Sequence, residues 1–295
     1  MELLDGRKVS KAIKEGIKSE VDKYIAKGFR APHLVAVLVG DDPASKFYVK
    51  SKMKSCEQVG FKSTNMSIDK SVSQGELLEI VENLNNNDDV DGYIVQLPLP
   101  KHLDVNKILE AISPEKDVDG FHPVNMGKLI LGLDTFVPAT PLGILEIIKS
   151  YDIQTSGKDV VVVGRSNIVG KPISICLSQK GYPGDSTVTI VHSRTDNIEE
   201  KLKSADIIIA AIGQPKFVKE HMVKAGAVVI DVGINRVEDQ TKKSGYALVG
   251  DVDFENVASK CSYITPVPGG VGLMTVTALI INTLKSYKKK YESTK

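Results

Sequence analysis

The segment that decides the fold is Asp159-Val160-Val161-Val162-Val163-Gly164-Arg165-Ser166-Asn167-Ile168-Val169-Gly170. Its run of valines predicts a strand that is buried on both faces, as in a parallel sheet. A loop with glycines at 164 and 170 follows, and the apolar spacing over 169–179 predicts a helix. A strand, a glycine loop and a helix in this order are typical of a nucleotide-binding sheet, where a pyrophosphate lies against unpaired N–H groups of the helix N-terminus. A tight structural turn is the alternative, because the full G-x-G-x-x-G pattern is missing.

The same alternation of strands and helices extends in both directions along the chain. Downstream, strands are expected at 187–191, 207–211 and 227–232, helices at 198–203, 218–224 and 274–287, a loop at 236–245 and a solvated tail at 288–290. Upstream, helices are expected at 9–21, 44–59, 73–84 and 141–150, and strands at 34–39, 61–68 and 92–95. The stretch 113–141 is rich in Pro, Gly and Asp and has only weak periodicity, which indicates an inter-domain or cleft-lining segment.

This pattern predicts an α/β protein with two domains around a cleft. The first domain is expected to span 1–139 and to be completed by a C-terminal helix at 273–295. The second, of the Rossmann type, is expected to span 140–272.

Composition excludes several classes of function. The 295 residues carry 38 Lys plus Arg against 37 Asp plus Glu, so there is no basic excess of the kind that nucleic-acid-binding proteins show. Three distant cysteines and five histidines without ligand spacing argue against a metal site and against a disulfide framework. No apolar run approaches the ~20 residues of a membrane span. We therefore expect a cytoplasmic protein with no metal, no nucleic-acid partner and no membrane segment.

The next loop of the second domain bears on the choice of cofactor. The strand at 187–191 runs into His192-Ser193-Arg194, where an NAD-binding sheet would place an acidic residue for the ribose 2′-hydroxyl. A hydroxyl and a guanidinium suit a 2′-phosphate instead. Of the five arginines in the chain, Arg165 and Arg194 fall on the two loops concerned. The sequence favours NADP over NAD, and a solvated surface charge is the alternative for Arg194.

Two groups of polar residues in the first domain are candidates for catalysis. Tyr48 and Lys52 stand one helical turn apart, and a lysine whose pKa is lowered by burial can relay a proton. Gln96, between Val95 and Leu97, follows a strand and can orient a substrate carbonyl. Chance occurrence of the Tyr–Lys spacing and a Pro-rich exit loop are the respective alternatives.

Two further segments can contact a flat heterocycle. Asp117 and Asp119 precede Gly120, and one carboxylate could accept N–H groups of a ring; capping of a turn is the alternative, and His122 is expected to be structural. The glycines of 268–272 allow the backbone to approach a ligand closely, and a hinge is the alternative.

Taken in order, these segments resemble the methylenetetrahydrofolate dehydrogenase/cyclohydrolase family over nearly the whole chain. The matching pieces include Tyr48-Val49-Lys50-Ser51-Lys52, Gln96 to Pro100, Pro114 to Gly120, Pro138 to Pro141, Gly164-Arg165-Ser166, His192-Ser193, Asp231 to Asn235, Gly250-Asp251-Val252 and Thr265 to Gly272. Leu273 stands where the family usually has Pro, which implies a local packing change at the start of the last helix.

The resemblance implies oxidation of 5,10-methylenetetrahydrofolate with NADP, and hydrolysis of the methenyl product to 10-formyltetrahydrofolate, in one-carbon metabolism. By resemblance Lys52 is the principal catalytic residue, Tyr48 stacks on the folate and helps to position Lys52, Gln96 hydrogen-bonds Lys52, and Asp119 anchors the pterin. The folate contacts implied in addition are Val95, Leu97, Pro268, Gly269, Gly270, Val271 and Gly272, and the cofactor contacts are Gly164, Arg165, Ser166, Ser193, Arg194 and Ile234.

The resemblance also implies a homodimer formed through the nucleotide-binding domain. Three alternatives remain open. A short-chain dehydrogenase would have its glycine loop before its Tyr–Lys pair, the reverse of the order here. A non-catalytic nucleotide sensor would be expected to lack Lys52 or Asp119. A family member with the dehydrogenase activity alone is the third.

Overall fold

The computed structural model describes residues 1–242 and 245–292. These form two compact units, one made of Met1–Ser10 and Thr140–Thr275, the other of Lys11–Ala139 and Val276–Lys295. Helices α1 (Gly6–Ala26) and α10 (Val271–Glu292) contribute residues to both units. The first residues of the chain therefore belong with the C-terminal sheet. We call the unit that holds 11–139 the N-terminal unit and the other the nucleotide-binding unit.

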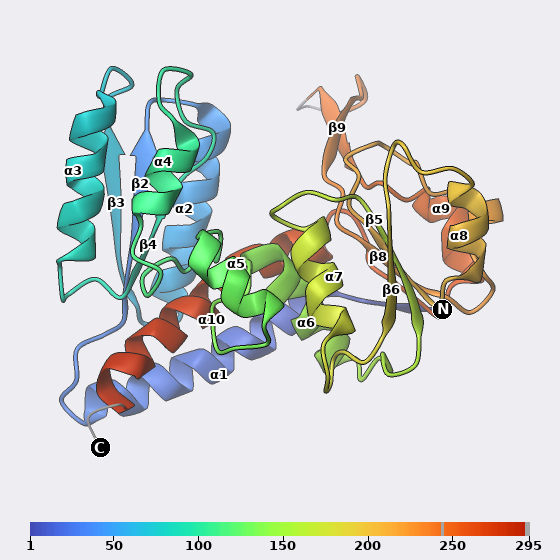
Figure 1. Ribbon diagram of the computed structural model, residues 1–295, viewed down its shortest axis with the longest axis horizontal. Coiled ribbons are helices and arrows are strands. Elements are labelled where there is room, and N and C mark those ends of the chain that lie inside the picture. Colours follow the sequence, from blue (N-terminus) through green and yellow to red (C-terminus); the bar gives the residue numbers. More distant parts are fainter. Residues whose placement is uncertain (243–244, 293–295) are drawn as a thin grey trace. The chain divides into compact units, whose positions relative to one another are not determined.

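The N-terminal unit is built on a parallel sheet of three strands in the order β3-β2-β4 (Figure 1). These strands are β2 (His33–Val39), β3 (Lys62–Ile68) and β4 (Gly92–Val95). Every residue of β2 is buried. Leu34, Ala36 and Leu38 face a core shared with α1, α2 (Pro43–Gln58) and α10. The alternate valines of β2 face α3 (Gln74–Asn85) and α4 (Val105–Ala111), so helices cover both faces, as a parallel sheet requires.

Local capping explains where the helices of this unit begin. Asp42 accepts the Ser45 N–H ahead of α2, and Ser73 and Glu76 form a reciprocal capping box for α3. Helix α5 (Pro123–Ile130), capped by His122, lies within the stretch 113–141, whose sequence has only weak periodicity. Its buried residues, Asn125 and Leu129, stand one helical turn apart.

The nucleotide-binding unit is built on a parallel sheet of six strands in the order β1-β11-β8-β7-β5-β6. The strands are β1 (Glu2–Leu3), β5 (Asp159–Val163), β6 (Thr187–Val191), β7 (Ile207–Ala210), β8 (Val228–Asp231) and β11 (Tyr263–Ile264). The helical segments are α6 (Ala139–Ser150), α7 (Gly170–Ser178), α8 (Ile198–Ser204), α9 (Phe254–Val257) and the 3₁₀ turns η1 (Glu220–Met222) and η2 (Ala258–Lys260).

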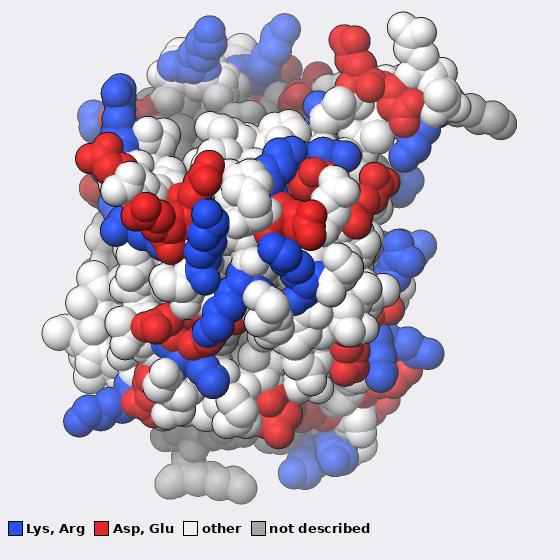
Figure 2. All heavy atoms as spheres, turned by 90° about the vertical axis from the view of Figure 1, so that its right-hand side faces the viewer, with Lys and Arg blue, Asp and Glu red and all other residues white. Residues whose placement is uncertain are grey.

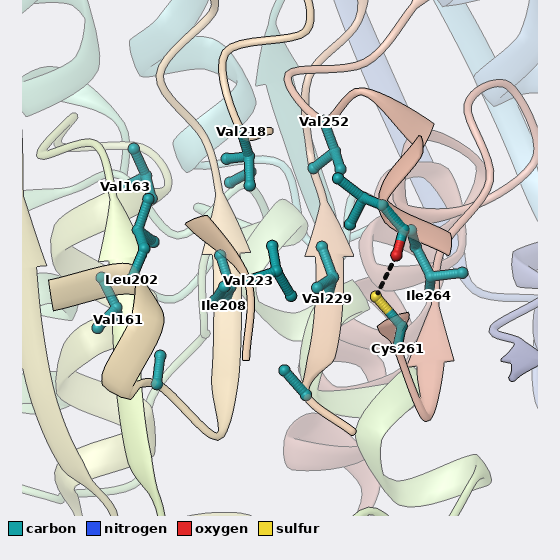
Figure 3. Close-up of a cluster of buried hydrophobic side chains, with 14 of the residues drawn as sticks. Val161, Val163, Leu202, Ile208, Val218, Val223, Val229, Val252, Cys261 and Ile264 are labelled. Carbon is teal, nitrogen blue, oxygen red and sulfur yellow. Dashed lines mark hydrogen bonds between the residues drawn. The ribbon is translucent and has the colours of Figure 1, made fainter. Parts of the chain in front are cut away.

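One core of this unit lies between the sheet and α8, η1 and α9. Figure 3 shows Val161 and Val163 of β5, Ile208 of β7 and Val229 of β8 on the same face of the sheet. The alternate residues Val160 and Val162 are also buried. The continuous valine run therefore forms a strand covered on both faces, and the predicted α/β class with a Rossmann-type sheet is confirmed.

Three local predictions for the C-terminal half were wrong. The segment 218–224 is not an α-helix, since only η1 forms there and Val218 bridges to Val252. The predicted loop 236–245 begins with β9 (Asn235–Glu238), which pairs antiparallel with β10 (Tyr246–Val249); residues 243–244 lie outside the described residues. The lysines of 288–290 belong to α10 and are no tail: Lys288 pairs with Glu20, and Lys290 donates to two backbone carbonyls. No described helix has the length and apolar character needed to span a membrane.

Candidate active site

The strand order of the nucleotide-binding unit defines where a ligand can lie. From β5 the chain moves to β6 at the edge of the sheet and then returns to β7 on the other side of β5. Ligands of open α/β sheets bind at such a switch point, outside the carboxyl ends of the strands. Gly164 follows β5 at this place with φ of 128°, and a Cβ on it would lie 2.2 Å from the Ala211 carbonyl oxygen. Glycine is required because the two loops pack backbone to backbone here.

Ser166 changes the expected role of the helix N-terminus. Its hydroxyl accepts the N–H groups of Val169 and Gly170 at 3.1 and 3.3 Å, and its carbonyl accepts that of Lys171. The first N–H groups of α7 are therefore not unpaired, contrary to expectation. Within the described residues, the amides of 165–168 have no acceptor, so the exposed loop itself is what can offer N–H groups to a phosphate.

The loop after β6 has a defined shape. The Nδ1 atom of His192 accepts the Arg194 N–H at 3.2 Å, and the Thr195 hydroxyl accepts the His192 N–H at 3.0 Å. Ser193 and Arg194 are exposed, as is Arg165 on the preceding loop. Neither guanidinium has an ion-pair partner among the described residues. The residues present fit a phosphorylated dinucleotide, because a hydroxyl and two unpaired guanidinium groups flank the switch point.

Ile234, the remaining cofactor candidate, lies beyond the carboxyl end of β8. It is 51% exposed, and its Cδ1 atom fills the space beside Gly272. The candidate folate residues 268–272 therefore belong to the nucleotide-binding unit together with the cofactor candidates.

In the N-terminal unit the structure brings Lys52 and Gln96 together. The Nζ atom of Lys52, on α2, donates to Oε1 of Gln96 at 3.0 Å. Gln96 follows β4, and its Nε2 donates to the Leu97 carbonyl at 2.7 Å, which turns Oε1 toward the lysine. Val95 is buried in the core. Tyr48, one turn before Lys52, is 47% exposed, so its ring is available for stacking on a ligand.

The two carboxylates of the Asp-Val-Asp segment differ in role. Asp117 accepts the N–H groups of Gly120 and His122 and the side-chain amide of Asn125, which makes it the capping residue of the turn. Asp119 has no hydrogen-bond partner within the described residues. Burial raises the pKa of Asp119, the charge of Lys52 lowers it, and Asp117 raises it. An unpartnered carboxylate near Lys52 is suited to accept N–H groups of a bound ring.

His122 is structural, as expected, because its Nδ1 accepts the Val124 N–H and caps α5.

The sequence did not single out Asn282. Its amide donates to the carbonyls of Val118 and Val137 at 2.8 and 2.9 Å, and this holds the residue before Asp119 against α10. A buried polar residue on the apolar face of the last helix is the signal that could have revealed it.

The described residues contain no group of three or more His, Cys, Asp or Glu side chains able to hold a metal ion. The three cysteines are free and buried, and burial raises the pKa of Cys56 and Cys176 to about 12, which leaves unreactive thiols. Charges of both signs are interspersed on the face drawn in Figure 2.

Comparison with known proteins identifies the class to which this fold and site belong. Residues 4–119 match the catalytic domain, and residues 138–291 the NAD(P)-binding domain, of the tetrahydrofolate dehydrogenase/cyclohydrolase family. The chain belongs to this family. The family resemblance seen in the sequence is thereby confirmed.

Individual relatives are similar along their full length. The chain is 57% identical to the bifunctional protein FolD of Bacteroides thetaiotaomicron over 289 residues, 98% of this chain and 99% of that protein. Its structure matches that of the bifunctional FolD enzyme of Campylobacter jejuni with a TM-score of 0.92 and 47% identity, covering 98% and 99% of the chains. It also matches the Trypanosoma brucei enzyme complexed with NADP cofactor and inhibitor, with a TM-score of 0.91 and 39% identity over 97% of each chain.

Proposed function

We propose that this chain oxidises 5,10-methylenetetrahydrofolate to the 5,10-methenyl compound with NADP, and hydrolyses that compound to 10-formyltetrahydrofolate. The observation that carries the proposal is the Lys52–Gln96 hydrogen bond of 3.0 Å beside the unpartnered Asp119, in a chain whose two halves match the two domains of the family. The non-catalytic sensor has no support from these residues.

The hydrolytic step is proposed to depend on Lys52. The methenyl compound is a cation, so the attacking water needs activation more than the electrophile does. Lys52 can exchange a proton with that water at Nζ, and Gln96 fixes the position of Nζ by its oriented amide. Asp119 would accept the pterin N–H groups, and the half-exposed ring of Tyr48 would stack on the folate.

The oxidative step is proposed to depend mainly on placement. Bound NADP supplies the hydride acceptor. The loop at Gly164–Ser166 would hold its phosphates, Ile234 would contact it beyond β8, and residues 268–272 would line the folate pocket.

We further propose NADP as the cofactor in preference to NAD. Arg165, Ser193 and Arg194 are exposed on the two loops at the switch point, and no acidic residue stands at the tip of β6 to bind a ribose 2′-hydroxyl. A phosphate there would form charge-assisted hydrogen bonds with the guanidinium groups.

We also propose that the functional domains span 1–139, completed by the last helix, and 140–272. A homodimer formed through the nucleotide-binding unit is a further proposal. Strand β6 is the edge of the six-stranded sheet, and its Ile190 is 40% exposed. An apolar side chain on an open sheet edge is suited to cover by a second copy of the chain.

An absorbance assay tests the proposed function. The protein is given 5,10-methylenetetrahydrofolate with NADP, and in parallel with NAD, while reduced cofactor and methenyl compound are followed together. The proposal requires reduced cofactor with NADP and no build-up of the methenyl compound. Accumulation would indicate a dehydrogenase alone, and no turnover with either cofactor would refute the proposal.

A further inference from the structure

Two buried aspartates near the carboxyl ends of β7 and β8 have no role in the function proposed above. Asp231 ends β8 and is 3% exposed, and Asp251 follows Gly250 and is fully buried. Neither forms an ion pair with a Lys, Arg or His side chain in the described parts of the chain. Buried carboxylates are costly, so each must be held by hydrogen bonds.

The carboxylate of Asp231 collects backbone N–H groups from two loops. Its Oδ1 accepts those of Gly233 and Asp251, and its Oδ2 accepts that of Val252, each at 2.9 Å. A Cβ on Gly250 would lie 1.8 Å from Oδ2, so glycine is required for this approach.

The carboxylate of Asp251 does the same for the loop after β7. Its Oδ2 accepts the N–H groups of Ile212 and Gly213, both at 2.8 Å, and its Oδ1 accepts the side-chain amide of Asn235 at 2.8 Å. The chain around Asp251 is fixed in turn, because its carbonyl accepts the Val218 N–H at 2.9 Å. Figure 3 shows Val218 and Val252 together beyond the carboxyl ends of β7 and β8.

The backbone that the pair holds borders the proposed cofactor site on two sides. Ile212 follows Ala211, whose carbonyl oxygen abuts Gly164 at the switch point. Gly233 directly precedes Ile234. The two aspartates thus fix the two loops that flank the cofactor residues, while both remain buried and out of reach of a ligand.

We propose that Asp231 and Asp251 are positioning residues for the cofactor: they hold the loops at 211–213 and 232–235 in the conformation that binds it, without touching it. The inference rests on the proposed function, because it assumes that the switch point binds NADP. A positioning role differs from a purely structural one, because replacing either aspartate should change cofactor binding and leave the hydrolytic activity in place.

The two proposed activities give an internal comparison. Hydrolysis of supplied methenyltetrahydrofolate needs no cofactor, whereas the dehydrogenase does. The experiment uses Asp251→Ala, with Asp251→Asn as the conservative variant, and measures the Kd for NADP, the KM for NADP, hydrolysis without NADP and the melting temperature. Asp206→Ala is the matched control, because Asp206 precedes β7 at its opposite end, where it accepts the Asp159 N–H and pairs with Lys224.

We expect Asp251→Ala to raise the Kd and KM for NADP by about tenfold or more, because three hydrogen bonds to a carboxylate are lost. Hydrolysis should stay within about twofold, since Lys52, Gln96 and Asp119 lie in the N-terminal unit. Asp251→Asn keeps one oxygen that can accept the N–H groups of Ile212 and Gly213. Its Kd for NADP should therefore lie between that of wild type and that of Asp251→Ala. Asp206→Ala should leave the Kd for NADP unchanged.

Three results would overturn the inference: an unchanged Kd for NADP in Asp251→Ala, an equal loss of both activities in that variant, or a Kd for NADP in Asp251→Asn as high as that in Asp251→Ala. If Asp251→Ala does not fold, Asp251→Asn is compared with Asp206→Ala instead, and equal Kd values for NADP in these two variants would overturn the inference. A wild-type chain that binds NADP but turns over no folate would refute the proposed function and leave this inference standing.

Discussion

Replacement of Lys52 by Met separates the two proposed activities. Methionine keeps an unbranched side chain of similar length on α2 and removes the amine. Two interactions are lost with it: the hydrogen bond to Gln96 Oε1 at 3.0 Å, and the positive charge that opposes the effect of burial on Asp119.

The size of the effect follows from these contacts. Removal of a general acid–base group costs about 10²–10⁴ in rate, or about 3–5 kcal/mol of activation free energy. Folding should change by only about 1 kcal/mol, because Lys52 and Gln96 are both partly exposed and solvent can replace their hydrogen bond. Burial raises the pKa of Asp119 and Lys52 lowers it, so in the variant this pKa rises further. On acidification the KM for folate should therefore rise more steeply in the variant than in wild type.

The assay measures hydrolysis of supplied methenyltetrahydrofolate and, separately, reduction of NADP with the methylene substrate. Lys50→Met is the matched control, because Lys50 is exposed on the same helix and the change in charge is the same. Hydrolysis by Lys52→Met that stays within tenfold of wild type, with dehydrogenase activity intact, would remove Lys52 from the mechanism.

The other predictions concern the nucleotide-binding unit. Arg165→Ala should raise the Kd for NADP at least about tenfold and leave that for NAD nearly unchanged; equal weakening by titration would place the 2′-phosphate elsewhere. Gly164→Ala should abolish cofactor binding because its Cβ would meet Ala211 at 2.2 Å, and an unaltered Kd would contradict the packing described. Burial raises the pKa of Asp231 to about 6 from 3.8, so the folded state retains a proton that the unfolded state releases. Wild type should then lose up to about 3 kcal/mol of unfolding free energy relative to Asp231→Asn between pH 4 and pH 6.5, and parallel pH profiles in urea would refute this. Light scattering should give the mass of a dimer for wild type and that of a monomer for Ile190→Lys. A monomeric mass for wild type would refute the proposed homodimer.

The strands could be predicted well because their signal is local. The strands predicted at 92–95, 159–163 and 187–191 have the bounds of β4, β5 and β6. An apolar run bounded by turn residues marks a buried parallel strand such as β4 or β5 without reference to the rest of the chain, and a run of β-branched residues marks the exposed edge strand β6 in the same way. The helix predicted at 218–224 was wrong because the structure of this segment depends on contacts that are distant in sequence. Its apolar residues pack into the sheet core, and Val218 bridges to Val252 far along the chain, a contact that no local pattern reveals.

In the candidate site, too, the sequence identified individual residues, while the contacts between them come from the fold. Lys52 and Gln96 were found as separate motifs; the family resemblance implied a hydrogen bond between them, and the fold shows it at 3.0 Å. The residues alone did not tell the roles of Asp117 and Asp119 apart, and only the family resemblance chose Asp119. The difference lies in which carboxylate accepts the N–H groups of the turn. Ser166 was assigned to the cofactor, and in the structure its hydroxyl also accepts the N–H groups of Val169 and Gly170. Short polar side chains serve a backbone or a ligand equally well by composition.

The distribution of candidates over the two units has a consequence for how the activities fail. Lys52, Gln96 and Asp119 belong to the N-terminal unit, whereas the cofactor candidates and residues 268–272 belong to the nucleotide-binding unit. Changes at the first group should lower hydrolysis most, and changes at the Asp231–Asp251 pair should lower cofactor binding alone. Residues 268–272 are proposed to contact folate, which both reactions use, so a bulky substitution at Val271 is expected to weaken both. A variant there that impaired only the dehydrogenase would move this segment from the folate pocket to the cofactor site.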